Sequence, residues 1–246
     1  MHVGHSEIGD KKYAGFRYGL PHRNLQFIGR LKELRQLSDI VHGAGKDQRK
    51  VAVLHGLGGI GKTDTVLEYV WQSHATYTSI VWIHAATAEI LKRSFMSVAQ
   101  HLIDHLVASC RPVQPDFTEI AHDLGIAGLI NASGHLVYEV KSDDQERIVG
   151  ALPKWLAIEG NDQWLLVFDN VDDINVIERT KHFPQSSSGT IIITTRRRGI
   201  AHWGTGSFQI EEMDPDDALA LLITRAHLVQ KQLSSAGEWQ TANHMN

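Results

Sequence analysis

Short, continuous runs of apolar residues recur along the chain and predict its strands. The clearest runs cover residues 51–54, 80–83, 164–168 and 190–194, and a weaker one covers residues 208–210. A strand that reads as an unbroken apolar run is typically covered by helices on both faces, as in a parallel sheet. The pattern therefore predicts a sheet of buried, mainly parallel strands.

Apolar residues at helical spacing occupy the intervals between these runs. The clearest example is a helix predicted over residues 31–42, where apolar residues recur from Leu31 to Val41 and glycines follow. Similar spacing predicts further helices, which cover residues 65–72, 88–108, 117–130, 144–159 and 215–228. Strands that alternate with helices in this way predict a three-layer α/β fold.

Individual residues refine these expectations. Asp214 is the expected N-cap of the last helix, because Pro215 follows it at the first helical position. Pro153 is expected to kink or restart the helix over residues 144–159, since proline has no N–H to donate. Residues 136–138 fit either a short strand or a loop.

Composition places the chain among ordinary globular proteins. It has 246 residues, of which 42% are hydrophobic and 21% charged, enough for one large α/β domain or two small ones. Residues 1–22 show little periodicity and are expected to be loosely ordered, and residues 229–246 form a polar tail. The folded domain is therefore expected over residues 23–228.

Charge and cysteine content exclude several classes of protein. The formal net charge of -4 offers no basic field, so we expect no nucleic-acid partner. No apolar run approaches the ~20 residues of a membrane helix, and the polar N-terminus does not resemble a secretory signal. A single cysteine, Cys110, excludes an internal disulfide and fits a reducing compartment. We expect a cytoplasmic protein without membrane contact, with the nucleus as the alternative.

A glycine-rich loop follows the first apolar run. It matches the phosphate-loop pattern G-x-x-x-x-G-K-S/T and reads Gly56-Leu57-Gly58-Gly59-Ile60-Gly61-Lys62-Thr63. Glycines let backbone N–H groups turn toward an anion, and the helix that begins near Gly61 adds its dipole. Lys62 supplies a positive charge for the β- and γ-phosphates, and the Thr63 hydroxyl is placed for Mg²⁺. Because the loop joins a buried strand to a helix, it predicts a site for ATP or ADP.

An acidic run follows residues 164–168. A carboxylate at the carboxyl end of a central strand points into the ligand crevice, so Asp169 is the candidate partner of Mg²⁺ through a water. Many phosphate-loop ATPases place a glutamate next to activate water, whereas this chain has Asn170, which cannot act as a base. Asp172 and Asp173 either substitute for it or belong to a solvated helix start. Hydrolysis is therefore expected to be slow.

Arginines follow the strand predicted over residues 190–194. An arginine at this place can reach a γ-phosphate and report its presence, and Arg196 is the candidate, unless it belongs to a basic surface turn. Arg197 and Arg198 are expected to face solvent or a partner.

Two histidines could suggest a metal site. His101 and His105 lie four residues apart on a predicted helix, a spacing that metal pairs use. No third ligand lies near them in the sequence, so we interpret them as ordinary surface or core residues.

In this order the motifs resemble the NB-ARC branch of the STAND nucleotide-switch ATPases, the central module of NOD-like immune receptors, in its fungal and bacterial forms. Residues 24–34 resemble the first motif of the family, F-(I/V)-G-R-x-x-E-L, and residues 56–63 spell its phosphate loop GLGGIGKT. The other matches cover residues 68–69, 79–83, 165–172, 189–196 and 208–222. The resemblance extends over about residues 20–228.

The resemblance implies a P-loop NTPase fold with a five-stranded parallel sheet, in which the acidic strand neighbours the strand that leads to Arg196. It implies that the backbone of Ile28 and the side chain of Arg30 contact adenine, whereas Phe27 is expected to pack in the core. Asp64 borders the cofactor site, and its charge would oppose phosphate binding unless it points away. The implied cofactors are ATP or ADP with Mg²⁺. The implied partners are further copies of the chain or other domains of a longer receptor.

Two later motifs of this family are not found. No Gly-Leu-Pro-Leu-like segment follows residue 222, and no Met-His-Asp-like segment is present in context. The subdomains that clamp the nucleotide are therefore expected to lie outside these residues. We expect a signalling switch that binds Mg-ATP or ADP and hydrolyses slowly. The alternatives are a catalytically inactive nucleotide-binding or interaction module and an AAA-type motor ATPase, which Asn170 disfavours.

Overall fold

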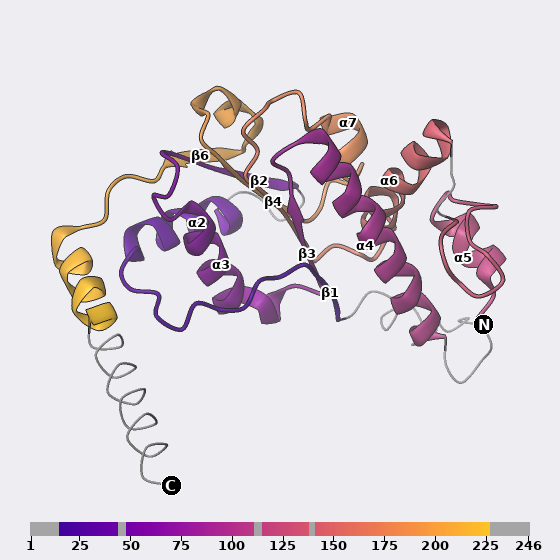
Figure 1. The fold of residues 1–246 in the computed structure, drawn as a ribbon, viewed down its shortest axis with the longest axis horizontal. Coiled ribbons are helices and arrows are strands. Elements are labelled where there is room, and N and C mark those ends of the chain that lie inside the picture. The colour runs from indigo at the N-terminus through magenta and orange to yellow at the C-terminus, as the bar shows by residue number, and fades with distance from the viewer. Residues whose placement is uncertain (1–14, 44–47, 111–114, 138–140, 227–246) are drawn as a thin grey trace, which may run out of the picture.

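The computed structural model describes residues 15–43, 48–110, 115–137 and 141–226. Several positions with sequence-based predictions lie outside these ranges, namely residues 1–14, Tyr138, the helix end at 227–228 and the tail at 229–246. Within the described ranges, the chain forms a layered α/β body with the sheet between helices (Figure 1).

The described strands form one six-stranded sheet in which every pairing is parallel. In chain order they are β1 (Phe16–Tyr18), β2 (Lys50–His55), β3 (Ser79–His84), β4 (Trp164–Asp169), β5 (Thr190–Thr195) and β6 (Gly206–Gln209). Their order across the sheet is β1-β3-β4-β5-β2-β6. All the predicted strands are confirmed, and β4, which ends at Asp169, neighbours β5, which leads to Arg196.

β1 is a strand that the sequence pattern did not predict, so the sheet has six strands rather than five. It lies in the segment expected to be loosely ordered. The ring of Phe16 packs edge-on against Trp155, with 5.3 Å between centroids. The Arg17 guanidinium donates to the carbonyl of Thr78 (2.7 Å). A strand of three residues is too short to show a periodic pattern, and only these tertiary contacts reveal it.

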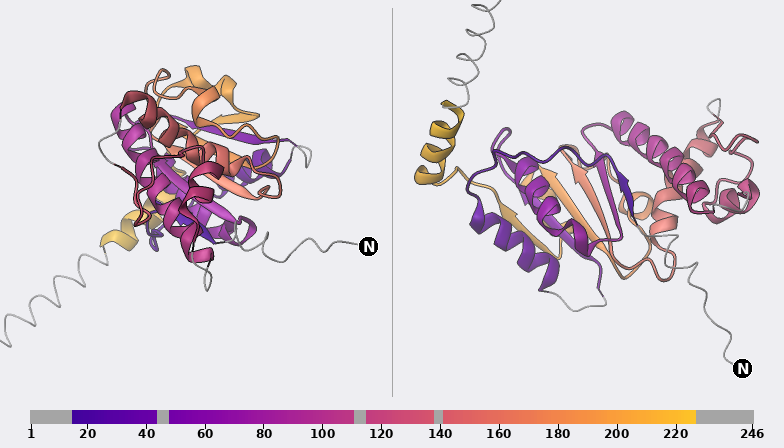
Figure 2. Two further views of the ribbon diagram at one scale, coloured as in Figure 1. Left: turned by 90° about the vertical axis from the view of Figure 1, so that its right-hand side faces the viewer. Right: turned by 90° about the horizontal axis from the view of Figure 1, so that it is seen from below.

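Helices cover both faces of the sheet and make the fold three-layered (Figure 2). On one face lie α2 (Leu31–His42) and α3 (Lys62–Ser73), and on the other lie α4 (Ala88–Ser109) and α6 (Ser142–Leu156). The shorter helices are η1 (His74–Thr76), α5 (Phe117–Asp123), α7 (Arg179–His182) and η2 (Arg198–Trp203). A last helix over residues 215–226 lies at the opposite end of the molecule from α5 (Figure 1). None of the described helices has the length and apolarity needed to cross a membrane.

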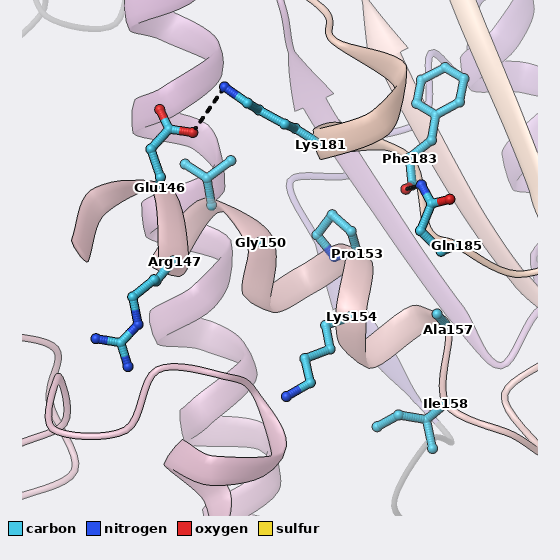
Figure 3. Close-up of a pocket in the computed structure, with 11 residues that line it drawn as sticks. Glu146, Arg147, Gly150, Pro153, Lys154, Ala157, Ile158, Lys181, Phe183 and Gln185 are labelled. Carbon is cyan, nitrogen blue, oxygen red and sulfur yellow. Dashed lines mark hydrogen bonds and ion pairs between the residues drawn. The ribbon is translucent and has the colours of Figure 1, made fainter. Parts of the chain in front are cut away.

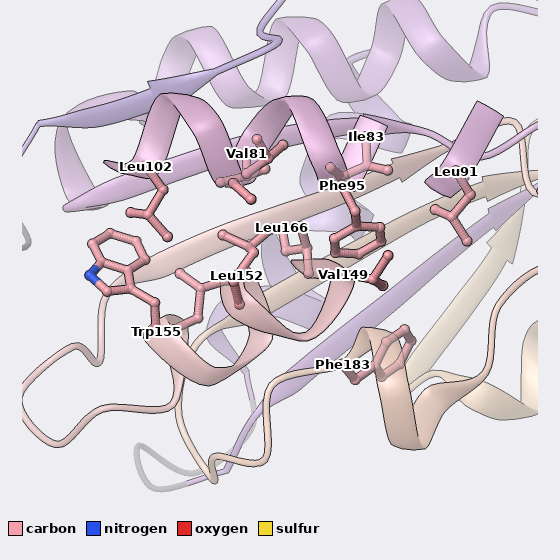
Figure 4. Packing of buried hydrophobic residues seen from close by; sticks show 14 of the residues in the cluster. Val81, Ile83, Leu91, Phe95, Leu102, Val149, Leu152, Trp155, Leu166 and Phe183 are labelled. Atoms are coloured by element: carbon pink, nitrogen blue, oxygen red, sulfur yellow. The ribbon is translucent and has the colours of Figure 1, made fainter. Parts of the chain in front are cut away.

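Successive side chains along a strand point to opposite faces of the sheet and pack into two separate cores. Val81 and Ile83 of β3 face α4 and α6, whereas Ile80 and Trp82 face α2 and α3. Figure 4 shows the first of these cores, in which Phe95 of α4 packs among residues of α6 and the sheet. Full burial of a side chain of this size contributes about 1.5–3 kcal/mol to the stability of the fold. Burial on both faces explains why the strands read as unbroken apolar runs.

α5 is shorter than the apolar spacing predicted. It ends at Asp123 rather than near residue 130. Gly125 adopts a φ of 76°, and the N–H of Ile126 donates to the carbonyl of Ala121 (2.8 Å), which closes the helix with a glycine cap. A left-handed glycine therefore stops this helix even though apolar residues continue beyond it.

Three smaller expectations have clear outcomes. α6 continues through Pro153, so the helix does not restart there, whereas the alternative of a kink stays a prediction. The proline lies in the last turn, where it removes one hydrogen bond close to the helix end. Leu136 makes an isolated antiparallel bridge with Ile130 and does not join the sheet. Asp214 is confirmed as an N-cap, since its carboxylate accepts from the N–H of Asp216 (3.0 Å).

Candidate phosphate-binding site

Three parallel strands end beside one another and bring the predicted site residues together. β2 leads into the glycine-rich loop and α3, β4 ends at Asp169, and β5 ends at Thr195, one residue before Arg196. Because β2 pairs with β5 and β5 pairs with β4, their carboxyl ends share one edge of the sheet. Parallel α/β sheets bind their ligands at this edge.

The loop between β2 and α3 depends on its glycines. Gly56, Gly59 and Gly61 adopt φ values of 154°, 75° and 99°. A Cβ on Gly56 would stand 2.5 Å from the carbonyl oxygen of Ile210, so this position also has no room for a side chain. The N–H of Thr65 donates to the carbonyl of Gly61 (2.9 Å), which leaves the preceding N–H groups in the first helical turn. Such a turn is a site for an anion.

The Lys62 side chain lies inside this loop. Its Nζ donates to the carbonyl oxygens of Gly56 (3.0 Å) and Leu57 (2.8 Å), and the residue is buried. Burial lowers the pKa of Lys62, and Arg196 lowers it further, whereas Asp172 and Asp169 act to raise it. A bound phosphate would supply the negative charge that compensates a buried ammonium.

Thr63 and Asp169 meet at the base of the loop. The Thr63 hydroxyl donates to Oδ1 of Asp169 (2.9 Å), and the Thr194 hydroxyl donates to the same oxygen (2.6 Å). The other carboxylate oxygen, Oδ2, lies 3.9 Å from Nδ1 of His84. Asp169 is buried, and these polar neighbours hold its carboxylate in place.

These oxygen atoms fit the requirements of Mg²⁺. Mg²⁺ is usually held by one or two carboxylates together with hydroxyls, waters and phosphates rather than by a cage of protein carboxylates. Where residues are described, no three His, Cys, Asp or Glu side chains form a metal-binding group. The Thr63 hydroxyl and the Asp169 carboxylate would therefore hold the ion together with the phosphates.

Asn170 occupies the position after Asp169 in a left-handed conformation. Its φ is 65°, and its N–H donates to the Thr194 hydroxyl (2.8 Å). Asparagine tolerates this conformation better than most residues. The side chain is an amide without basic character, so the structural position of Asn170 offers no proton acceptor for a water.

Arg196 lies beside the phosphate loop and pairs with Asp172. Its Nε and one terminal nitrogen lie 2.6 Å and 2.5 Å from Oδ2 of Asp172, and its backbone N–H donates to Oδ1 (3.0 Å). The Arg196 Cδ lies 3.5 Å from the point where a Cβ on Gly58 would stand. Arg196 therefore lies beside the loop, and its guanidinium binds a carboxylate that the sequence left unassigned, so its contact with a γ-phosphate stays a prediction.

The loop, the strand order and the Thr63–Asp169 contact together decide the fold. The chain has a P-loop NTPase fold. Its P-loop joins a buried parallel strand to a helix, and its acidic strand ends opposite the first helical turn, as phosphate binding with Mg²⁺ requires.

Comparisons with known proteins identify a distant relative. A "Nucleotide-binding leucine-rich repeat (NLR)-like protein" of Hyaloscypha variabilis is 25% identical over 222 residues, which are 82% of this chain. The chain spans only 19% of the length of that relative. No protein-family model matches the chain.

Solved structures show a looser similarity. The crystal structure of Cdc6p from Pyrobaculum aerophilum has 15% sequence identity and a TM-score of 0.46, over 85% of this chain and 50% of that one. The ORC1 protein of Aeropyrum pernix, solved in complex with DNA, has 18% identity and a TM-score of 0.43, over 82% of this chain and 50% of that one.

Arg30 joins the segment before α2 to the P-loop. It is a non-glycine residue with a positive φ (61°), and it is buried. Its guanidinium donates to the carbonyls of Ile60 (2.8 Å) and Glu211 (2.7 Å) and pairs with Glu33 (2.9 Å). The described contacts of Arg30 are thus within the protein, and its contact with adenine stays a prediction.

A hollow of about 500 Å³ adjoins the P-loop beside Arg30. It lies between Gly59 and Ile60 on one side and Met213 and Leu222 on the other. Its place next to the phosphate loop and its apolar walls suit a nucleotide base. Ile28, the other predicted adenine contact, is half-buried, and the role of its backbone also stays a prediction.

Asp64 and Phe27 are two further residues with sequence-based expectations. The Asp64 side chain is exposed, and its Oδ1 accepts from the Asn24 amide (3.4 Å). Its charge is therefore directed to the segment before α2. Phe27 packs against the core between α2, α3 and the sheet, which confirms the expected role in packing.

The two candidate metal-binding histidines pack against aromatic rings. His101 lies edge-on to Tyr18 (5.1 Å between centroids), and His105 lies against Phe16 (5.3 Å). Both partners belong to β1. The two side chains therefore help to hold the edge strand, which agrees with their interpretation as ordinary surface or core residues.

A second hollow, of about 690 Å³, lies on the α6 side of the sheet (Figure 3). Pro153 and Ala157 form part of its wall, and an ion pair between Lys181 and Glu146 (3.4 Å) closes one side. Arg147, Lys154 and Lys181 also line it, but none of its lining residues belongs to the glycine-rich loop, so this hollow is separate from the candidate phosphate-binding site.

One residue beside the site was missed in the sequence. His84 ends β3 in register with Asp169, and its side chain is exposed. The signal that could have found it is the rule already applied to Asp169, since His84 directly follows the buried run over residues 80–83.

Proposed function

We propose that the chain is the ATP/ADP-binding switch module of a STAND protein of the NOD-like receptor type. The observation that carries the proposal is the Thr63–Asp169 hydrogen bond (2.9 Å) beside the buried Lys62, which joins both halves of a Mg-nucleotide site. The name of the Hyaloscypha relative, which is 25% identical, supports the link to NOD-like receptors.

Different residues of the site would bind the phosphates, the Mg²⁺ ion and the base. The N–H groups of the loop and the dipole of α3 would hold the phosphate oxygens, and Lys62 would neutralise their charge. Thr63 and Asp169 would hold Mg²⁺, which supplies further positive charge to the β- and γ-phosphates. The hollow beside Ile60 would receive the base. Arg196 would report the terminal phosphate.

Slow hydrolysis is part of this proposal, and Asn170 supports it. An amide cannot take a proton from the attacking water, so this position offers no general base. The same observation favours one alternative, a catalytically inactive nucleotide-binding or interaction module. Single-turnover release of phosphate separates the two. Release that is lost in Asp169→Ala supports the slow ATPase, and no release supports the inactive module.

Calorimetric titration of the purified chain with Mg-ATP and Mg-ADP tests the binding site. Lys62→Ala is expected to weaken both affinities at least about tenfold, because the phosphates lose a close positive charge. Lys32→Ala removes an exposed lysine of α2 and serves as the control, with unchanged affinity. Equal affinities of Lys62→Ala and the parent chain would overturn the site assignment.

The resemblance to NOD-like receptors also suggests where the protein acts and what it contacts. We propose a cytoplasmic protein in which the nucleotide controls contacts with other copies of the chain or with further domains. Size-exclusion chromatography with ADP and with a non-hydrolysable ATP analogue tests this, since a switch predicts different association in the two states. The net charge of -4 supports the expectation that nucleic acid is not a partner.

A further inference from the structure

Asp172 holds the arginine that would read the terminal phosphate. We propose that Asp172 is a nucleotide-specificity residue, which competes with the γ-phosphate of a nucleoside triphosphate for Arg196 and so lowers the preference of the site for triphosphate over diphosphate. This inference rests on the proposed function. It concerns which nucleotide the site prefers rather than whether the site binds one.

The backbone places Asp172 opposite Arg196. The N–H of Val171 donates to the carbonyl of Thr194 (2.8 Å), which extends the pairing of β4 and β5 beyond Asp169. Both oxygens of Asp172 are then used by one residue. Oδ1 accepts from the backbone N–H of Arg196, and Oδ2 accepts from two guanidinium nitrogens. The carboxylate therefore occupies the coordinating face of the guanidinium, which is the face that binds phosphate oxygens.

The pair lies within the electrostatic field of the phosphate site. Arg196 passes beside Gly58 of the P-loop, with its Cδ 3.5 Å from the position of a Cβ there. The charges of Asp172 and Arg196 both act on the pKa of Lys62, the first raising it and the second lowering it. A terminal phosphate gripped by Lys62 would therefore be repelled by Asp172 and attracted by Arg196.

Arg196 can exchange Asp172 for a phosphate because the arginine side chain is in contact with solvent. The side chain of Arg196 is 60% exposed, whereas that of Asp172 is 16% exposed. Ion pairs with an exposed member contribute little to stability, so breaking this one costs little. Burial acts to raise the pKa of Asp172, but the contacts with Arg196 outweigh it, and the pKa lies below its ordinary value. The carboxylate is thus charged at neutral pH, and it competes as an anion.

A nucleoside diphosphate does not compete with Asp172 for Arg196. It has no γ-phosphate to displace Asp172 from Arg196, so the pair persists beside it. A triphosphate must displace the carboxylate and then lie close to its charge. The difference predicts that neutralising Asp172 favours the triphosphate selectively.

Calorimetric titration of Asp172→Asn with ADP and with a non-hydrolysable ATP analogue, both with Mg²⁺, tests the proposal. The affinity for the triphosphate is expected to rise roughly five- to tenfold, the effect of removing one partly screened like charge, while that for ADP changes less than about twofold. Asp162→Asn is the control, since it removes the same charge at the opposite end of β4 and should change neither affinity. Asp172→Ser provides a second neutral variant if the asparagine destabilises the turn.

A double variant separates competition for Arg196 from simple repulsion. In an Arg196→Gln background, Asp172→Asn is expected to increase triphosphate affinity by less than it does in the parent chain. Equal gains for both nucleotides, no gain, or a loss of triphosphate affinity would each overturn the proposal. If the parent chain binds neither nucleotide, the proposed function fails and this inference fails with it. If the parent binds both and Asp172→Asn changes nothing, only the inference fails.

Discussion

Thr63 and Asp169 lie 106 residues apart in the sequence and are joined by a hydrogen bond of 2.9 Å. One belongs to the first turn of α3 and the other ends β4. The strand β5, which lies between β4 and β2, contributes the Thr194 hydroxyl to the same carboxylate oxygen (2.6 Å). The Asp169 carboxylate thus links β4, β5 and the first turn of α3 at one point.

Asp169→Asn tests the role of this carboxylate in holding Mg²⁺. The amide oxygen can still accept from Thr63, so the fold should persist, but the charge is lost. In the presence of Mg²⁺ the affinity for ATP is expected to fall about tenfold, and in EDTA it should be nearly unchanged. Titrations under both conditions measure the difference. Thr63→Ser, which keeps the hydroxyl, is the control, and equal losses with and without Mg²⁺ would contradict the assignment.

Gly189→Ala is expected to be strongly destabilising because the residue packs on Trp164. An added Cβ would lie 2.1 Å from a ring atom of that tryptophan, and the φ of 83° is also unfavourable for alanine. We expect a loss of about 3–4 kcal/mol in the free energy of unfolding. Gly160→Ala is a matched control with a φ of 86° and nothing within 4 Å, so it should cost only about 1 kcal/mol. Urea unfolding measures both, and similar losses would refute the steric argument.

Arg30→Ala is expected to lower the stability of the fold. The substitution removes a buried guanidinium and leaves the Glu33 carboxylate and the Ile60 carbonyl without this donor. A loss of about 3 kcal/mol in the free energy of unfolding is expected, since one member of a buried pair is removed. Arg35→Ala on the exposed side of α2 is the control and should cost less than about 0.5 kcal/mol. A normal urea midpoint for Arg30→Ala would show that the buried contacts are dispensable.

The Arg23–Glu68 ion pair makes stability depend on pH. The hydrogen bond from Arg23 holds the pKa of Glu68 below its ordinary value of 4.5, although burial opposes this. A carboxyl whose folded pKa is depressed stabilises the fold above its unfolded pKa, and this contribution is lost as the pH falls through the folded pKa. The parent chain should therefore lose stability as the pH falls below 4.5.

Glu68→Gln is expected to remove this part of the pH dependence. At pH 7 the variant should be less stable by about 1–2 kcal/mol, and the difference should shrink in acid, where the parent loses the charge on Glu68. Urea unfolding at pH 7 and in the acid range measures it. Glu159→Gln at an exposed position should leave the pH profile unchanged. A gap between parent and Glu68→Gln that stays constant with pH would be incompatible with this account.

Local sequence was sufficient for the buried strands and for the phosphate loop. Both depend on contacts between near neighbours: a strand covered on two faces must be apolar at every position, and the loop needs glycines within a few residues of Lys62. The position of Asp169 followed from the same logic, because parallel strands end at a common edge. The neighbouring β4 and β5 were expected only from the family resemblance, and the strand pairing confirms them.

Tertiary structure decided the features whose partners are distant in sequence. β1 has too few residues for a pattern and is held by Trp155 and the histidines of α4. The end of α5 depends on the backbone angle of Gly125, which apolar spacing does not encode. The partner of Arg196 depends on how the chain turns after β4, because a guanidinium binds whichever anion the fold brings to it. Sequence therefore determined the elements and the phosphate loop through short-range constraints, and only the packing of β4 against β5 decided that Arg196 meets Asp172.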